Sequence, residues 1–594
     1  MKIQHWIPLI ILVGIAGCKK LDQTPEDTAT GAVVFGTTQG LELYATSFYN
    51  VLPSASNIHE GDAMADYAAR TQVPDFLVAG AYGPRQSTGW DTDDWRNLRN
   101  INYFLANNTD TRVAESVRNH YNGLARFFRA WFYFDKVKRF GDVPWIGKPF
   151  NVDDPALYAG RDSRTVVIDS ILADLQYACE NISTTSDNTR SLITKNVAWA
   201  FRSRVCLFEG TFRKYHTNYQ LTETATSLLQ DAATSAEVVM KSGSFALNTA
   251  GGTDLSYRQL FISETPVTQE IMLSNVMSST LNVLNDANWW WTSATYGARV
   301  SLIRTFVNTY LNVDGTPFTS RPGYETMTFM EEVKGRDKRL QQTIRMGDYK
   351  RINGGVTEPA PPVFSYTYTG YQPIKWTLDD TYYDGGSRNT NSICIMRYAE
   401  VLLNYAEAKA ELGTLTQDDW SKTIGALRRR AGITENTDAL PTVADPYLKA
   451  HYFPSLSDPI LLEVRRERGI ELALEGFRFY DLVRWHAGNL MEMEWNGFYV
   501  PALNQPMDLN EDGKPDVCFY QQMPANPVAG VTYVNVAPTL SGGTPNPQRL
   551  SNNTYGELTW LNNVPRKWEE KHYLYPIPET AITVNPALTQ NPGW

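Results

Sequence analysis

The 594-residue sequence predicts a mainly α-helical protein in which paired helices are combined with a large loop-rich region. Apolar and aromatic residues recur every three or four positions over residues 113–140, which is the pattern of a long amphipathic helix. From about residue 250 to residue 394, Gly, Pro, Thr, Tyr and Trp are instead interspersed without a period, which is typical of irregular structure. Long loops usually carry function, so we expect the ligand-binding part there.

Helical periodicity appears on both sides of this loop-rich region. We expect further helices over residues 165–181, 194–209, 222–241, 300–310, 395–412, 420–430 and 461–476. Paired helices with Ala at close-packed positions predict a tetratricopeptide-like helical-pair solenoid, although no strict repeat of about 34 residues is present. We assign the pairs to about 95–245 and 395–490, and loops with minor β structure to about 250–394 and 496–594, all in a single domain over 18–594.

Composition and charge narrow the class of protein. The chain is 42% hydrophobic and 20% charged, which is ordinary for a globular protein and unlike a disordered one. Lys and Arg number 54 against 64 Asp and Glu, for a net charge of −10, and no block of Lys and Arg is long enough to follow a phosphate backbone. Because a surface that follows a phosphate backbone needs clustered positive charge, we expect no nucleic-acid partner.

The first residues have the pattern of a secretion signal. Lys2 precedes an apolar stretch over residues 7–17, which is shorter than the roughly 20 residues needed to span a bilayer. The stretch ends in Ile-Ala-Gly-Cys at residues 15–18, which resembles a bacterial lipobox. We therefore expect residues 1–17 to be removed and Cys18 to be lipidated, so that acyl chains anchor the chain to a membrane. The alternative is a plain signal peptide with a chance Cys.

Four further cysteines, Cys179, Cys206, Cys394 and Cys518, have no CxxC pairing and no zinc-site spacing. We interpret them as small buried apolar residues. A bridge between Cys179 and Cys206 remains an alternative in an oxidising compartment.

Several segments, in a consistent order, are similar to a known family. Residues 397–408 read RYAEVLLNYAEA, and residues 467–485 contain Glu-Arg, Glu-Leu-Ala, Glu-Gly-Phe-Arg, Asp-Leu and Arg-Trp. The segments 125–144, 310–315, 336–340 and 575–594 agree with the same family. Together they resemble the SusD/RagB family of surface glycan-binding lipoproteins.

The resemblance implies a fold, a location and a partner. Members are α-helical lipoproteins with four tetratricopeptide-like helix pairs and a loop-rich face, anchored to the extracellular side of the outer membrane. They dock on a SusC-like TonB-dependent transporter, capture oligosaccharide or, in some members, peptide, and do no chemistry.

Three carboxylates of the family motifs are four residues apart. Glu467, Glu471 and Glu475 would share one helix face, with Arg465, Arg468, Arg478 and Arg484 nearby. Paired carboxylates can serve acid–base catalysis, but so much arginine favours a salt-bridged network that holds helices together.

Two aromatic clusters fall in loops and are candidates for ligand binding. A sugar has an apolar C–H face and a rim of hydroxyls, so its site needs exposed flat rings beside polar groups. Trp289, Trp290 and Trp291 are consecutive, with Tyr296 after them, and no helix or strand can bury three consecutive indoles on one face. Trp90-Asp91 is the second candidate. In both places the alternative is that the indoles only fill the core.

One further motif has the spacing of metal ligands. Asp508, Asn510, Asp512 and Asp516 occupy positions 1, 3, 5 and 9 of a calcium-type loop, with Gly513 at position 6. Position 12 is Phe519, so the usual bidentate Glu is missing. We expect a possible structural Ca²⁺ and no organic cofactor, and the alternative is an Asp/Asn-Gly turn without metal.

Catalytic motifs are absent from the sequence. It has seven His, no HExxH, no GxSxG, no GxGxxG and no complete P-loop. We therefore expect a cell-surface protein that binds an oligosaccharide and passes it to a transporter, and not an enzyme. Peptide binding, a pure scaffold for the transporter, and a glycoside hydrolase without a local signature remain alternatives.

Overall fold

The structure, a computed structural model, describes residues 31–151 and 153–594. The expected signal peptide, residues 1–17, and the expected lipidation site, Cys18, lie outside this range. Helix makes up 43% of the chain and strand 10%, which confirms the prediction of a mainly α fold. Of the described helices, none is both long and apolar enough to cross a membrane.

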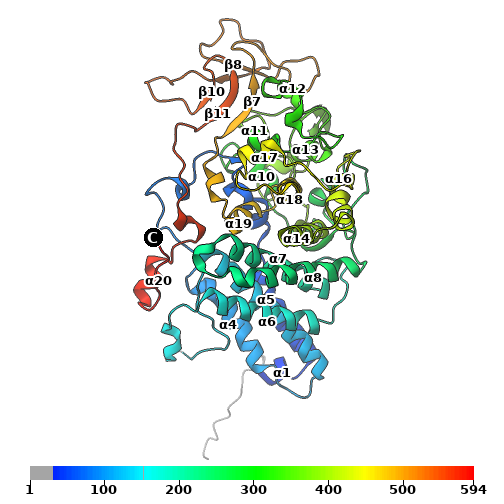
Figure 1. Ribbon diagram of the computed structural model, residues 1–594, viewed down its shortest axis with the longest axis vertical. Helices are drawn as coiled ribbons and strands as arrows, with labels where there is room; N and C mark the ends of the chain where they lie inside the picture. The colour runs from blue at the N-terminus through cyan, green and yellow to red at the C-terminus, as the bar shows by residue number, and fades with distance from the viewer. Residues whose placement is uncertain (1–30, 152) are drawn as a thin grey trace, which may run out of the picture.

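The first helices form a layer in the lower part of Figure 1. These helices are α1 (Gly31–Phe35), α2 (Thr38–Thr46), α4 (Thr92–Asn107), α5 (Glu115–Phe140), α6 (Arg164–Asn181), α7 (Lys195–Tyr215) and α8 (Ala225–Lys241). The short α3 (Ala55–His59) lies apart from this layer, with His59 next to Asp286. Each long helix packs on the next: α4 on α5, α5 on α6, α6 on α7, and α7 on α8. Consecutive antiparallel packing of this kind is the helical-pair arrangement that the sequence predicts.

A second helical group covers this layer. It consists of α14 (Tyr398–Glu411), α15 (Gln417–Trp420), α16 (Ala426–Arg430), α17 (Pro446–His451), α18 (Pro459–Glu471) and α19 (Arg478–Arg484). Helix α14 packs against α7, α8 and α18, and so joins the two groups. Two expected helices differ in detail: a π-helical turn over Ser421–Gly425 interrupts the expected 420–430, and Ile393–Arg397 forms strand β6, so the expected helix at 395 begins only at Tyr398.

The remaining regions are loops with short strands and helices. The strands are β1 (Ala68–Ala69), β2 (Ile271–Asn275), β3 (Ser301–Leu302), β4 (Lys350–Asn353), β5 (Val356–Pro359), β6, β7 (Asn496–Val500), β8 (Val517–Tyr520), β9 (Thr532–Asn535), β10 (Gln548–Leu550) and β11 (Gly556–Trp560). The short helices are α9 (Gln259–Ile262), α10 (Ala287–Thr292), α11 (Arg304–Val307), α12 (Phe329–Glu332), α13 (Lys338–Thr343) and α20 (Glu579–Val584). Of the helix expected over 300–310, only α11 forms.

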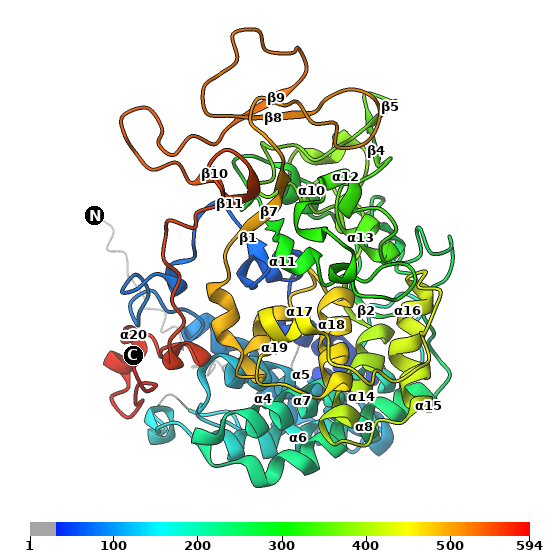
Figure 2. The ribbon, with the colours of Figure 1, turned by 45° about the horizontal axis from the view of Figure 1, so that its top comes forward.

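The strands form small sheets of two or three strands, several of which join distant parts of the chain. β1 pairs with β3, β2 with β6, and β4 with β5, all antiparallel, while β10, β11 and β7 form one antiparallel three-stranded sheet. Only β8 and β9 pair in parallel among the named strands. In Figures 1 and 2 the strands β7 to β11 lie at the end of the molecule opposite α4 to α6.

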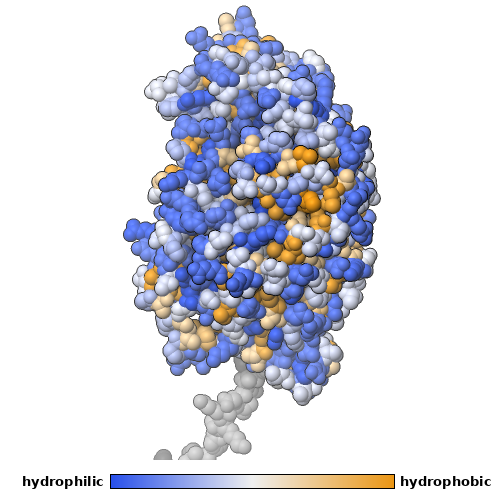
Figure 3. Space-filling view, in the orientation of Figure 1, coloured by the Kyte–Doolittle hydropathy of each residue, from blue (hydrophilic) through white to orange (hydrophobic). Residues whose placement is uncertain are grey.

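Most of the aromatic residues pack inside. Trp131 of α5 stacks on Phe201 of α7 with ring centroids 4.2 Å apart, which joins two helix pairs. The face seen in Figure 3 is mainly hydrophilic, apart from an apolar patch at the level of α13, α16 and α18. Cys179, Cys206, Cys394 and Cys518 are buried and free, so the structure contains no bridge between Cys179 and Cys206.

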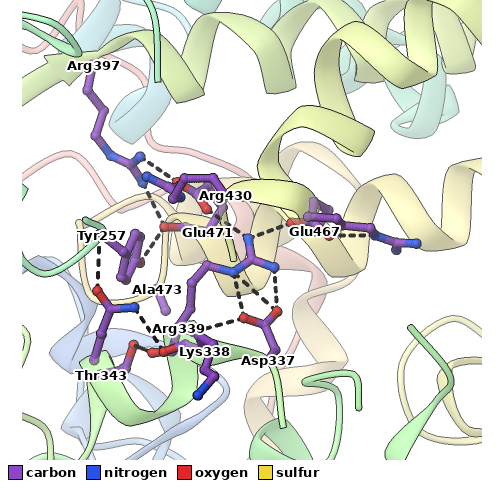
Figure 4. A network of polar contacts seen from close by, with 12 residues as sticks. Tyr257, Asp337, Lys338, Arg339, Thr343, Arg397, Arg430, Glu467, Glu471 and Ala473 are labelled. Carbon is purple, nitrogen blue, oxygen red and sulfur yellow. Dashed lines mark hydrogen bonds and ion pairs between the residues drawn. The ribbon is translucent and has the colours of Figure 1, made fainter. Parts of the chain in front are cut away.

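The acidic and basic motif residues form a buried network, shown in part in Figure 4. Glu471 Oε1 accepts a hydrogen bond of 2.6 Å from Arg397 and another from Arg430, while its Oε2 accepts one of 2.8 Å from Arg339. Arg339 also contacts Glu467, and both carboxylates are fully buried. Because the network joins α13, α16 and α18, the interpretation of these glutamates as part of a salt-bridged scaffold is confirmed. Their partners are not the expected arginines, which pair with other carboxylates: Arg465, Arg468, Arg478 and Arg484.

The prediction that Glu475 shares a helix face with Glu467 and Glu471 is wrong. Helix α18 ends at Glu471, so Glu475 does not continue its face. The chain turns back through Leu474 and Gly476, both in the left-handed region, at φ 66° and 81°. This turn brings the Glu475 carboxylate to Arg397 Nη2, at 2.7 Å, and to Lys375 Nζ, at 2.6 Å.

Candidate functional site

The three consecutive tryptophans lie on the short helix α10, which points them in different directions. Trp290 and Trp291 are 6% and 4% exposed and pack edge to face against each other, with centroids 4.7 Å apart. Trp289 is only half-buried, and its indole stacks on the Tyr296 ring at 3.8 Å with an interplanar angle of 12°. Tyr296, the outer residue of this stack, is 44% exposed. We call Trp289 and Tyr296 the aromatic platform.

A carboxylate fixes the outer ring of the platform. The Tyr296 hydroxyl donates a hydrogen bond of 2.7 Å to Asp286 Oδ2, and Asp286 Oδ1 lies 3.2 Å from Nε2 of the buried His59. The hydrogen bond with His59 lowers the pKa of Asp286 to about 2, and the bond to Asp286 raises the pKa of Tyr296 to about 12. Asp286 is therefore ionised and Tyr296 neutral near neutral pH. An ionised carboxylate beside an exposed ring offers acceptor oxygens at the edge of a flat apolar surface.

The loop that carries Tyr296 is packed tightly on α10. Backbone N–H groups of Thr295 and Tyr296 donate to Ser293 Oγ, which closes a turn. At Gly297 an added Cβ would lie 1.7 Å from the carbonyl oxygen of Trp290, so only glycine allows this approach. The position of the platform thus depends on a backbone contact.

A second aromatic stack lies next to Arg299, which follows Tyr296 in the same loop. Tyr368 and Trp560 stack at 3.8 Å and 10°, and Trp560 is partly exposed. Arg299 joins the two stacks because its Nη1 donates to the Tyr368 hydroxyl at 3.2 Å while its Nε donates to the Ala294 carbonyl at 2.9 Å. This stack could not be predicted from the sequence. It joins residues far apart in the chain, and no local spacing marks it.

A third exposed aromatic residue lies on the turn packed against α10. The turn is the 3₁₀ helix η9 (Thr381–Asp384), and Asn288 holds it by donating 2.9 Å hydrogen bonds to the Leu378 carbonyl and to Asp384. Tyr382 of η9 is 61% exposed, and the Arg388 guanidinium lies 5.0 Å from its ring centroid. Aromatic and polar side chains therefore continue beyond the platform.

The ring of the second predicted cluster, Trp90-Asp91, is buried. Trp90 is 9% exposed and packs edge-on against Trp95 and Phe140 at 5.4 and 5.0 Å, so the expectation of an open indole there is wrong. Asp91 caps α4 by accepting from the backbone N–H groups of residues 93 and 94. It also lines a polar hollow of about 500 Å³ with Asp94 and Lys136. In Figures 1 and 2, α4 lies away from α10, so the two clusters are not brought together.

The acidic loop before β8 folds into a turn closed by its own side chains. Asp508 accepts from the backbone N–H groups of Glu511 and Gly513 at 2.7 and 2.8 Å, and Asp516 accepts from Leu509 at 2.7 Å. Burial, together with the charges of Asp508 and Asp512, raises the pKa of Asp516. Oxygen ligands suit a hard cation such as Ca²⁺, but the carboxylates of Asp508, Asp512 and Asp516 do not all lie within 4.8 Å of one another. A Ca²⁺ site of Asp508, Asn510, Asp512 and Asp516 therefore stays a prediction.

Removal of calcium provides the test of this loop. If the loop holds Ca²⁺ in the folded state only, EGTA lowers the thermal midpoint by about 2–5 °C, because a ligand bound only to the folded state stabilises it. Added to the EGTA-treated protein after removal of the chelator, Ca²⁺ raises the midpoint of the unchanged chain and leaves that of an Asp508→Asn variant where it was. An identical midpoint with and without EGTA would leave the turn as a structure without metal.

The fold and the site define a class of protein: a helical-pair solenoid with a loop-rich part that carries an exposed aromatic surface. Comparison with known proteins agrees. The SusD family model matches residues 268–594, which is more than half of the chain, and a second model, described as "Starch-binding associating with outer membrane", matches residues 83–207. The chain belongs to the SusD family.

Similar proteins extend the match over most of the chain. SusD-like protein P2 of Formosa agariphila is 24% identical over 511 residues, covering 81% of this chain and 90% of the relative. A crystal structure of a SusD-like protein from Bacteroides fragilis has a TM-score of 0.67 at 21% identity, covering 94% of this chain and 98% of the other. A SusD-like carbohydrate-binding protein from Bacteroides fragilis has a TM-score of 0.65 at 19% identity, covering 94% and 100%.

Proposed function

We propose that this protein binds an oligosaccharide and that a sugar ring lies on the aromatic platform of Trp289 and Tyr296. The observation that carries the proposal is the exposed outer ring of a stack whose hydroxyl is held by an ionised carboxylate. The ring faces the C–H surface of a pyranose, and Asp286 accepts from hydroxyls at its edge. The Tyr368–Trp560 stack and Tyr382 supply further surface for neighbouring sugar units.

The comparisons support the ligand class. One matched family model is described as starch-binding, and one solved relative with the same fold is described as carbohydrate-binding. These descriptions belong to the relatives, and the platform is the feature of this chain that fits them.

We also propose where the protein acts. The family description places its members in association with the outer membrane. Acyl chains on Cys18 would anchor the chain on the extracellular face, and the bound oligosaccharide would pass to a SusC-like TonB-dependent transporter. Co-purification of the lipidated chain with a transporter from detergent-solubilised outer membranes tests this part of the proposal.

A glycan and peptide array tests the ligand class directly. We expect the chain from residue 19 onward, which contains every described residue, to bind one class of oligosaccharide and no peptide. Binding to peptides alone would favour peptide capture. Binding to nothing, in a chain that still assembles with the transporter, would favour a scaffold.

We propose that the protein binds its ligand without cleaving it. Asp286, which accepts from the platform hydroxyl, is held ionised by its hydrogen bonds, so it cannot itself serve as the general acid that cleavage needs. An oligosaccharide incubated with the purified chain for hours should stay intact. Accumulation of shorter products would overturn this point.

Substitution of Gly297 should lower oligosaccharide affinity by moving the platform. In a Gly297→Ala variant the loop must move away from the Trp290 carbonyl, which displaces Tyr296, so we expect oligosaccharide affinity to fall about tenfold. Isothermal titration calorimetry measures the change. Gly83→Ala is the matched control, because its Cβ would meet nothing closer than 3.8 Å. Equal affinity in both variants would show that the loop position is irrelevant.

A further inference from the structure

Two histidines and a glutamate converge where the C-terminal segment meets the helical layer. His216 caps the C-terminal end of α7, His486 follows α19, and Glu570 begins the 3₁₀ helix η12 (Glu570–Tyr573). One potential ligand atom from each of the three side chains lies within 4.8 Å of the other two. The cluster lies outside both the aromatic platform and the acidic loop.

One ring nitrogen of His216 has a hydrogen-bond partner and the other has none among the described residues. It is fully buried, and its Nε2 lies 2.6 Å from the Val483 carbonyl oxygen. A carbonyl only accepts, so Nε2 must carry the proton and donate. Nδ1 then has a free lone pair, and among the described residues it has no hydrogen-bond partner. A buried polar atom without a partner is costly, so Nδ1 needs an explanation.

This hydrogen bond is the one that metal-binding histidines usually make. A ligating imidazole donates its other ring N–H to a carbonyl or carboxylate, which fixes the tautomer and turns the free lone pair toward the metal. The His216 ring is further held by stacking on Phe212, with centroids 4.0 Å apart. The ring is therefore pre-oriented as a nitrogen ligand.

The other two side chains already have suitable spacing. His486 Nε2 lies 3.2 and 3.3 Å from the two carboxylate oxygens of Glu570. Two ligands that each lie about 2.0–2.1 Å from a tetrahedral Zn²⁺ are about 3.3 Å apart, so the pair can take the ion with little movement. The His486 ring stacks on Tyr573 at 4.4 Å and lies edge to face with His216 at 4.7 Å.

The backbone at His486 also supports a specific role. His486 has φ 54°, in the left-handed region that non-glycine residues rarely adopt. Its N–H donates to the Val483 carbonyl, the same oxygen that accepts from His216 Nε2. One carbonyl thus holds both the His216 ring and the backbone of His486.

We propose that His216, His486 and Glu570 bind a divalent transition-metal ion, with Zn²⁺ the best match, and leave a fourth position for water. Two nitrogen donors select against Ca²⁺ and Mg²⁺, which prefer oxygen. The ion ties the C-terminal segment, which runs beside the helical layer in Figure 1, to the ends of α7 and α19. This site is independent of the oligosaccharide and of the acidic loop at residues 508–516.

Metal titration of the untagged chain from residue 19 onward, stripped with a chelator, tests the site. We expect calorimetry to give one Zn²⁺ per chain, a higher thermal midpoint with Zn²⁺, and visible absorption of a tetrahedral Co²⁺ complex when Co²⁺ replaces it. His486→Asn and Glu570→Gln should each weaken Zn²⁺ binding by about tenfold or more. Asn tolerates the left-handed backbone at residue 486, and both side chains are partly exposed, so these variants should fold.

His451→Asn is the matched control, since His451 is exposed on α17 and lies outside the cluster. It should bind Zn²⁺ like the unchanged chain. The proposal is overturned if the unchanged chain binds no Zn²⁺, or if His486→Asn and Glu570→Gln bind it as tightly as the control does.

Discussion

A variant that lacks both rings of the platform, Trp289→Ala with Tyr296→Ala, should bind oligosaccharide about a hundredfold more weakly than the unchanged chain. The two substitutions remove the apolar surface on which the sugar stacks, for a loss of about 2.7 kcal/mol. Most of the Trp290 and Trp291 packing that holds α10 stays in place, so the fold should persist. Calorimetry with an oligosaccharide found on the array measures the affinity.

Tyr158→Ala provides the control for this variant. Tyr158 is 58% exposed on the short 3₁₀ helix over Pro155–Tyr158, in the helical part of the chain. Its removal should leave the affinity unchanged. If the double variant keeps the thermal midpoint and the oligosaccharide affinity of the unchanged chain, the platform is excluded as the site.

Substitution of Glu471 by Gln should lower the free energy of unfolding by about 3–5 kcal/mol. Glu471 is the shared partner of Arg339, Arg397 and Arg430, all buried, and its loss leaves these guanidiniums short of negative charge. Removal of one partner from a buried ion pair has a cost of this size, because the remaining charge is desolvated without compensation. Denaturant unfolding of both proteins measures the difference.

An exposed ion pair gives the comparison. Glu237 and Lys241 pair one turn apart on α8, with 41% and 72% of their side chains exposed. Glu237→Gln should change the free energy of unfolding by no more than about 0.5 kcal/mol. A similar small effect at Glu471 would mean that the buried network contributes little to the fold.

The same network predicts sensitivity to acid. Burial alone would raise the pKa of Glu471, but the charges of Arg430, Arg397 and Arg339 outweigh burial and hold the pKa well below its usual 4.5. The folded pKa is thus below the unfolded one. The stabilisation is present in full above about pH 4.5 and is lost as the pH falls further. Unfolding of the Glu471→Gln variant should depend less on pH in that range.

Long helices could be predicted from the sequence because their pattern is local. Helices α5 and α6 begin and end within two residues of the expected 113–140 and 165–181. The helix expected to run to Gly476 ends at Glu471, because two left-handed residues turn the chain back. That turn is stabilised by contacts of Glu475 with residues on other segments, which no helical period reports.

The site could be predicted only in part for the same reason. A row of three indoles indicates that they cannot all be buried on one face, and Trp289 is indeed the one left half-buried. The row does not show which ring faces outward, and that depends on the close approach of Gly297 to α10. Trp90 looked similar in sequence, but it is buried by Trp95 and Phe140.

A crystal structure of the chain with a bound oligosaccharide tests the central claim most directly. We predict a pyranose ring parallel to the exposed face of Tyr296, at a stacking distance of about 4 Å, with a hydroxyl within hydrogen-bonding distance of Asp286. An oligosaccharide bound instead in the polar hollow beside Asp91, with the platform empty, would contradict the account.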